Sequence, residues 1–245
     1  MSAEALRHLR RVDPTLGQLI RRIGPCGLKP ERVMSPYMAL LRAIAHQQLN
    51  GHAAEAIFAR FLALHPGPGS PQPDAVLASD PADLRTCGLS RAKVASIRAI
   101  SEAALAGVIP SRRAAARLSD EALIERLTTL PGIGRWTVEM LLIFTLGRQD
   151  ILPVDDFGIR EGYRLLHGMP AQPKPRALAE IGAAWAPYRS TAAWYLWKRA
   201  NEEKRVKTQT PKETAPPPRE TPPGRRHAAS ARRRAKPQTA PAERG

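Results

Sequence analysis

Apolar residues recur at helical spacing along most of the first 200 positions. Between residues 37 and 49 they follow the i, i+3, i+4, i+7 spacing of one helical face, and residues 53–62 show a second such face. The Asn50-Gly51 pair between them predicts a turn or kink. We expect a loop over 66–73 and a helix over 91–105. No stretch alternates over the length of a strand, so the pattern predicts an all-α fold.

The last 45 residues have a different composition. Positions 201–245 hold eight prolines, 12 Lys and Arg against 5 Asp and Glu, and no Phe, Trp or Tyr. Such a segment buries too little apolar area to offset the entropy lost on ordering. We therefore predict a helical domain over 1–203 and a disordered, basic, Pro- and Arg-rich tail over 204–245. The tail either adds salt-sensitive phosphate contacts or only solubilises the protein.

Charge and cysteine content narrow the function classes. The 245 residues carry a formal net charge of +16, which favours a polyanionic partner, with nucleic acid first and an anionic membrane second. Two cysteines, Cys26 and Cys87, are too few for a disulfide framework, a four-thiolate zinc site or a cubane iron–sulfur cluster. Neither a membrane-spanning run nor a signal-peptide core is present. We expect a cytoplasmic protein.

The stretch 127–142, LTTLPGIGRWTVEMLL, predicts a helical hairpin. A helix over 120–129 should end before Pro131, because the residue before a proline disfavours helical geometry. Gly132 and Gly134 then permit positive φ angles and close approach of another backbone. The next helix begins with unpaired N–H groups, which favour a phosphate oxygen, and Thr137 offers a hydroxyl donor. An ordinary tight turn is the alternative interpretation of Gly-x-Gly alone.

The hairpin sequence LPGIGRWT resembles that of the DNA glycosylase superfamily that pairs a helix-hairpin-helix with a Gly/Pro-rich loop and an aspartate. The remainder of that signature is similar to ILPVDDFGIREGYRLL at 151–166. Two further blocks, LLRAIAHQQL at 40–49 and WAPYRSTAAWYLW at 185–197, resemble the DNA-3-methyladenine glycosylase II family. The resemblance covers roughly residues 15–200. It implies two helical lobes with an active-site cleft between them, and duplex DNA containing damaged bases as the partner.

The resemblance also places the catalytic carboxylate. It makes Asp156 the match, leaving Asp155 as a neighbour and candidate helix cap; we expect at least one of the two to cap the helix. A carboxylate beside C1′ stabilises the positive charge that builds on the sugar, or activates the attacking water. Relatives that also cut the backbone carry a lysine where this chain has Trp136. This implies a monofunctional, cofactor-free hydrolase that leaves an abasic site.

Most of the twelve aromatic residues lie in or beside the matched blocks. The resemblance implies base-pocket roles for Trp136, Phe157 and Trp197, whose rings suit a cationic alkylated purine. Met140 stands at a pocket position that can carry a ring in the family, so we expect a softer pocket. The other aromatics that we weighed are predicted to be core residues: Trp185, Tyr188 and Trp194.

The block 46–49 lies where family members insert a side chain into the stack left by the flipped nucleotide. Gln48 is the best match for this wedge and Leu49 the next; a polar helix end beside a turn is the alternative. His46 and His52 lack a partner acid, so we predict surface residues and no metal site. The resemblance does allow an ion held by carbonyl oxygens of the hairpin backbone.

Arg189 has two interpretations, a phosphate contact or an ion pair that holds the last helix near Asp155. The function that the sequence favours is a monomeric glycosylase for 3-methyladenine-type purines in duplex DNA, without the N-terminal β domain of some relatives. A glycosylase for deaminated purine or uracil is the alternative among enzymes. A non-catalytic hairpin module that only binds DNA is the alternative of another class.

Overall fold

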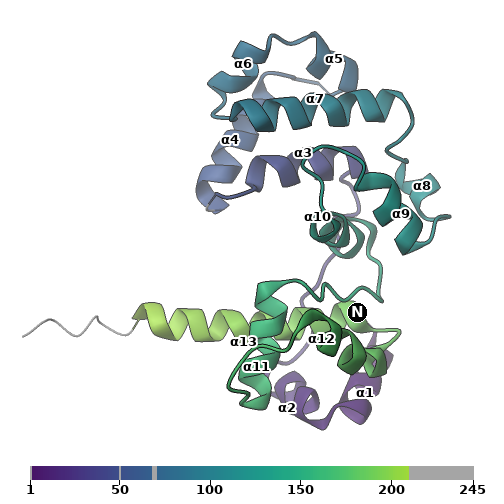
Figure 1. Cartoon of the computed structure of the whole chain (residues 1–245), viewed down its shortest axis with the longest axis vertical. Helices are drawn as coiled ribbons and strands as arrows, with labels where there is room; N and C mark the ends of the chain where they lie inside the picture. Colours follow the sequence, from purple (N-terminus) through teal and green to yellow (C-terminus); the bar gives the residue numbers. More distant parts are fainter. Residues whose placement is uncertain (1, 50, 68–70, 210–245) are drawn as a thin grey trace, which may run out of the picture. The chain divides into compact units, whose positions relative to one another are not determined.

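The computed structural model describes residues 2–49, 51–67 and 71–209, and within these ranges all regular structure is helical (Figure 1). No helix in the described ranges is long and apolar enough to cross a membrane. The elements, in chain order, are α1 Ala3–Val12, α2 Pro14–Ile23, α3 Pro36–His46, α4 Gly51–Ala63, α5 Pro73–Ala78, α6 Pro81–Thr86, α7 Arg91–Leu105, α8 Arg112–Ala115, α9 Asp120–Leu127, α10 Arg135–Met140, the π-helix η1 Leu141–Leu146, α11 Phe157–His167, α12 Pro175–Gly182, the 3₁₀ helix η2 Ala183–Trp185 and α13 Arg189–Gln209. The prediction of an all-α fold is confirmed.

Two apolar cores divide these helices into two lobes. The hairpin lobe comprises α3–α10 and η1, around a core that includes Leu40, Phe61 and Ile97. The terminal lobe comprises α1, α2, α11–α13 and η2, around Leu9 and Trp185. Figure 1 shows that the first two helices join the last three in this lobe, so the chain leaves it after α2 and returns at α11.

Local signals explain where most helices begin. Ser35, Ser90 and Ser119 each cap a helix by accepting from a backbone N–H three residues later. The helix expected over 91–105 is α7, with these bounds. Proline occupies the first position of α2, α3, α5, α6 and α12, where its missing N–H costs nothing.

Three predicted boundaries are wrong. The loop expected over 66–73 ends earlier, because Pro73 already begins α5. The helix expected over 120–129 ends at Leu127, since the hydroxyls of Thr128 and Thr129 donate to carbonyls of its last turn. α13 continues to Gln209, six residues beyond the predicted end of the domain. The remainder of the predicted tail, 210–245, and Asn50 of the predicted turn lie outside the described residues.

The helix after the hairpin changes its winding. α10 passes into the π-helix η1, and Gly147, at φ 73°, ends it. The N–H of Arg148 donates to the carbonyl of Leu142 at 2.9 Å. A π-helical turn widens the helix and is often found at functional sites. It places Phe144 on the exposed side of the hairpin lobe.

Candidate active site

The two hairpin glycines have different surroundings. Gly132 has φ 81°, and a methyl group on its Cα would lie 2.8 Å from Oγ of Ser96 and 3.1 Å from Cδ1 of Ile44. Gly134 has φ −93° and nothing within 4 Å of such a methyl. Of the two glycines that permit positive φ, only Gly132 adopts it. Gly132 therefore serves the packing of the hairpin, and Gly134 leaves its outer face open.

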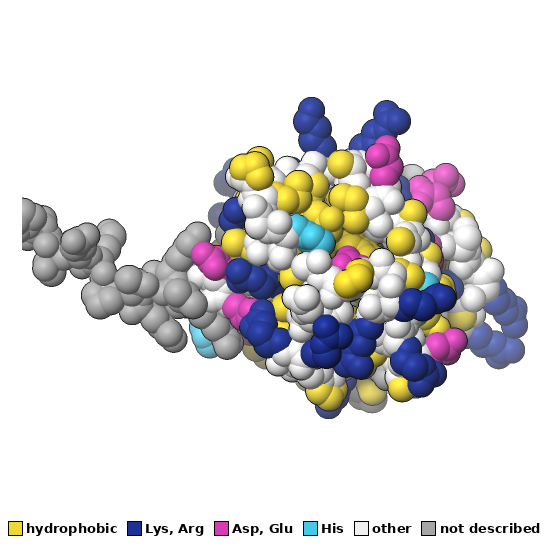
Figure 2. Space-filling model, turned by 90° about the horizontal axis from the view of Figure 1, so that it is seen from below, with side chains coloured by type: hydrophobic (Ala, Val, Ile, Leu, Met, Phe, Trp, Pro, Cys, Tyr) yellow, Lys and Arg dark blue, Asp and Glu magenta, His cyan; other side chains and the backbone are white. Residues whose placement is uncertain are grey.

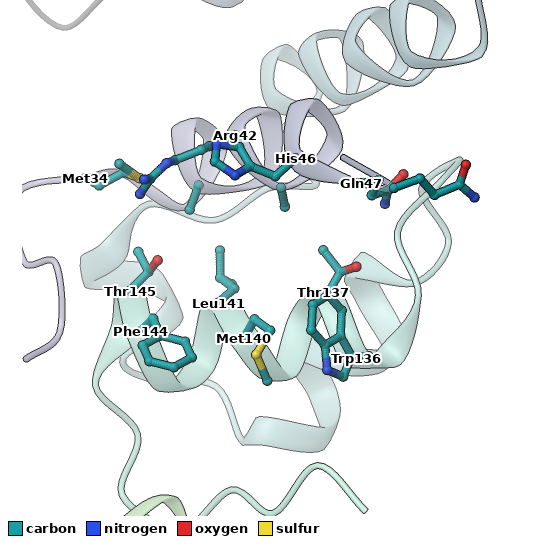
Figure 3. Close-up of a pocket in the computed structure, with 13 residues that line it drawn as sticks. Met34, Arg42, His46, Gln47, Trp136, Thr137, Met140, Leu141, Phe144 and Thr145 are labelled. Carbon is teal, nitrogen blue, oxygen red and sulfur yellow. The ribbon is translucent and has the colours of Figure 1, made fainter. Parts of the chain in front are cut away.

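α10 begins directly after Gly134, without a side-chain cap at its first turn. Uncapped N–H groups at a helix start attract an anion, whereas the charge of Arg135 on this turn is paired with Glu121 and Glu139. Thr137, expected to contribute a phosphate donor, is buried and faces α3 (Figure 3). Because the Thr137 side chain is buried in the wall of the cavity beside α3, its hydroxyl is not placed to meet a phosphate outside the protein.

Asp156 is held by three N–H donors from three elements. Its Oδ1 accepts from the backbone N–H of Ile159 at 2.8 Å and from Nε1 of Trp197 at 2.9 Å. Its Oδ2 accepts from Nε1 of Trp136 at 2.7 Å. Asp156 itself is the N-cap of α11, whereas Asp155, the expected candidate for the cap, is exposed. Charge-assisted bonds from two lobes thus orient one carboxylate.

A cavity of about 530 Å³ lies between α3 and the helix formed by α10 and η1. Figure 3 shows Trp136, Met140, Leu141 and Phe144 on its lower wall. Its upper wall comes from α3 and the segments that flank it. The volume and the largely apolar lining are typical of a pocket for a small organic group. Trp136 connects the two features, because its ring lines the cavity while its N–H binds Asp156.

The chain matches the family model described as HhH-GPD superfamily base excision DNA repair protein over residues 41–187. The chain belongs to this superfamily. It is 44% identical over 209 residues to the DNA-3-methyladenine glycosylase 1 of Schizosaccharomyces pombe, covering 84% of this chain and 91% of that protein.

Two solved structures are similar to this HhH-GPD protein. One is an S. pombe 3-methyladenine DNA glycosylase in complex with abasic DNA, with a TM-score of 0.74, 44% identity and coverage of 80% of this chain and 96% of that one. The other is a DNA-3-methyladenine glycosidase from Bacillus halodurans, with a TM-score of 0.75, 32% identity and coverage of 83% and 92%.

The predicted pocket residues of this HhH-GPD protein fall into two groups. Trp136 and Met140 line the cavity. Phe157, 62% exposed, and Trp197 do not line it; Trp197 instead faces Asp156 and packs at 5.6 Å, ring centre to ring centre, against Phe144. Sequence reasoning overlooked Phe144 as a pocket residue. Its spacing of four residues from Met140, one turn along a helix, is the signal that indicates it.

The residues predicted to be core aromatics mostly are. Trp185 is 1% exposed and donates to Asp13, and Trp194 packs against both cores. Tyr188 is only partly buried and packs edge-on against His8.

His46 differs from its prediction as a surface residue. Its ring lines the cavity, and its buried Nε2, 3.5 Å from Oε1 of Glu55, makes no hydrogen bond within the described ranges. Burial lowers the pKa of His46, opposed by the negative charge of Glu55 and assisted by Arg42 and Lys93. The imidazole is thus favoured in its neutral form. α3 therefore contributes a polar group to an otherwise apolar cavity, which periodicity alone does not indicate.

Glu139 and Arg189 are each paired with an oppositely charged side chain. Burial raises the pKa of Glu139 to about 7; Arg135, 3.2 Å away, opposes this rise, and the negative charges of Asp155 and Asp156 add to it. Arg189 forms a bidentate pair with Asp150, at 2.7 and 2.9 Å. Of its two interpretations, the ion pair is correct but the expected vicinity of Asp155 is wrong, because the last helix begins beside the 148–151 segment.

The candidate wedge lies on an exposed turn after α3. Gln48 has φ 57°, unusual for a residue other than glycine, and both Gln48 and Leu49 are exposed. Across the described part of the chain, no three His, Cys, Asp or Glu side chains gather as metal ligands would. Figure 2 shows Lys and Arg side chains spread over one face of the molecule, consistent with the net charge of +16.

Proposed function

We propose that this HhH-GPD protein is a monofunctional DNA glycosylase that releases alkylated purines of the 3-methyladenine type from duplex DNA. The observation that carries the proposal is the carboxylate of Asp156, oriented by the indole N–H groups of Trp136 and Trp197. A module that only binds DNA has no need of a carboxylate held in this way. The similarity to 3-methyladenine glycosylases of known name supports the choice of substrate.

The geometry supports an electrostatic mechanism. As the bond between base and C1′ lengthens, positive charge builds on the sugar. A carboxylate held in place by hydrogen bonds stabilises that charge without reorganising, and it also orients a water for attack on C1′. Alkylation makes the purine cationic and already labile, so the reaction needs little help from a general acid. Hydrolysis of the glycosidic bond releases the base and leaves an abasic site in a strand whose phosphodiester backbone is intact.

The base would bind against Trp136. A cationic purine gains both stacking and cation–π attraction on an indole face. The cavity beside this ring continues along Met140 and Phe144, whose apolar surfaces exclude water. Extruding the base costs a few kcal/mol, roughly what stacking on aromatic side chains returns.

Absence of lyase activity follows from the same residue. The position that carries the Schiff-base lysine in bifunctional relatives holds Trp136, and an indole nitrogen has no lone pair available for attack on C1′. We further propose that the protein acts as a monomer without a resident cofactor, since one chain supplies the carboxylate, both indoles and the hairpin. An ion on the hairpin carbonyls remains a prediction.

The test is incubation with N-methylated duplex DNA followed by mass spectrometry of the released bases. Release of 3-methyladenine, with strands that break only after alkali treatment, is the expected result. Strand breakage without alkali would contradict the monofunctional mechanism. Parallel substrates containing hypoxanthine or uracil test the alternative: release of those bases, with none from methylated DNA, would overturn the alkylpurine assignment.

A further inference from the structure

The turn that carries Gln48 is fastened to two other parts of the hairpin lobe. Nζ of Lys93, on α7, donates to the carbonyl of Ala45 at 2.8 Å and to that of Gln47 at 2.9 Å. Nε2 of Gln47 donates to the carbonyl of Gly132 at 2.9 Å. The end of α3, the first turn of α7 and the glycine turn of the hairpin therefore meet at one point.

The ammonium of Lys93 donates to carbonyls that would accept from backbone N–H groups if α3 continued. The last carbonyls of a helix lack an intrahelical partner, and a buried one without a partner is costly. Burial lowers the pKa of Lys93, and its side chain is only partly exposed. Since both of its identified acceptors are protein carbonyls, the ammonium is occupied in holding the turn.

The packing around Gly132 extends the same junction. Ser96 lies one helical turn after Lys93 on α7, and its Oγ lies 2.8 Å from the position a methyl on Gly132 would take. One face of α7 thus holds the end of α3 through Lys93 and contacts the hairpin through Ser96. Gln47 closes the third side by bonding the hairpin directly.

We propose that Lys93 and Gln47 are positioning residues that hold the Gln48–Leu49 turn at a fixed distance from the hairpin. The inference rests on the proposed function, because only a base-extruding enzyme needs such a turn. When the hairpin holds the DNA backbone, the turn enters the base stack at a defined place. If the turn moved when the bases pressed on it, the stack would close again. The free energy needed to extrude the base would then not be supplied. The same bonds hold the residues just before Gln48, whose backbone has the left-handed φ of 57°.

The primary test is the variant Lys93→Met, which keeps the length of the side chain and removes the donors. The probe is a duplex with 2-aminopurine beside a tetrahydrofuran abasic analogue, whose fluorescence rises when a side chain displaces the stack. At saturating protein we expect the rise given by the wild type to fall at least twofold in Lys93→Met and in Gln47→Met. Lys93→Arg, which keeps donors and charge, should recover part of it.

The matched control is Arg91→Met, which removes a cation from the same turn of α7. Arg91 is exposed and lies two residues from Lys93. If Lys93 acted only through its charge on DNA, both variants would lose the same fluorescence. We expect Arg91→Met to keep the full rise, and equal losses in the two variants would overturn the proposal.

A second measurement separates positioning from general damage. Base release is compared on native and heat-denatured N-methylated DNA, because an unpaired base needs little extrusion. Lys93→Met should lower the rate on native DNA about tenfold and the rate on denatured DNA less than twofold. Equal losses on both, or an unchanged fluorescence rise, would contradict the inference. No release by the wild type would instead refute the proposed function, while the fluorescence experiment would still decide the role of Lys93.

Discussion

The hairpin and the carboxylate site meet at the first turn of α10, yet they are held in different ways. The hairpin is shaped by its backbone: a positive φ at Gly132, an open Gly134, and the carbonyl of Gly132, which accepts from the side chain of Gln47. The carboxylate of Asp156 is oriented by side chains, one indole from each lobe. The turn of the hairpin therefore follows from its own glycines, although Gln47 and Ser96 support it from elsewhere in the chain, whereas the carboxylate depends on residues 20 and 41 positions away.

The largest effect should come from Asp156→Asn. Asparagine is also a good N-cap, so α11 should keep its start and the protein its stability. Loss of the negative charge should lower single-turnover base release between about a hundredfold and a thousandfold. DNA affinity, measured on an abasic-analogue duplex, should change less than about threefold. Unchanged base release would show that another group stabilises the sugar.

The next effect concerns stability against pH at Glu139, on the helix that joins the two regions. Its pKa is about 7 when folded, above the ordinary 4.5, so the folded state keeps a proton that the unfolded state has released between these values. Stability should therefore fall by about 3 kcal/mol as pH rises from 4.5 to 7, and then level off. Urea unfolding between pH 5 and 8 measures it. Glu139→Gln should flatten the slope; an equal slope in the variant would assign it to other groups.

Gly132→Ala tests whether the hairpin needs the positive φ of Gly132. A left-handed φ costs an ordinary residue about 1–2 kcal/mol, and the added methyl would press on Ser96. We expect about 2 kcal/mol loss in the free energy of unfolding, measured by urea denaturation. A neutral result would mean that the hairpin relaxes without loss.

Trp197→Phe removes one of the two indole N–H donors that orient the carboxylate of Asp156. Phenylalanine keeps the ring against Phe144 but removes the N–H on Oδ1 of Asp156. A hydrogen bond to a charged group contributes about 1.5–3 kcal/mol, so base release should fall at least about tenfold. Trp194→Phe is the matched control, because Trp194 packs on Gly27 and Lys198 rather than on the carboxylate. Equal losses in both variants would indicate a packing effect.

The smallest effect should come from Gly134→Ala. Its φ of −93° suits alanine, and nothing lies within 4 Å of the added methyl, so stability should stay within about 0.5 kcal/mol. If a phosphate approaches this face, the methyl should weaken binding to duplex DNA severalfold, as measured by fluorescence anisotropy at fixed salt. Unchanged affinity would place the backbone contact elsewhere.

The features that were predicted correctly are those determined by residues close together in the sequence. α7 has the predicted bounds because Ser90 caps it and its apolar positions keep one period. The hairpin and the placement of Asp156 in front of a helix also followed from short motifs. The two indole bonds on Asp156, the pocket side of His46 and the pairing of Arg189 with Asp150 depend on which helix faces meet. No pattern of neighbouring residues indicates which helix faces meet, so these contacts could be found only from the structure.

In the proposed mechanism, the indole of Trp197 acts on the reaction through the carboxylate of Asp156. A double-mutant cycle tests it most directly: single-turnover base release by wild type, Asp156→Asn, Trp197→Phe and the double variant. If Trp197 acts through the carboxylate, adding Trp197→Phe to Asp156→Asn should cost less than about twofold further. A further loss as large as that of Trp197→Phe alone would contradict the claim and give Trp197 an independent role.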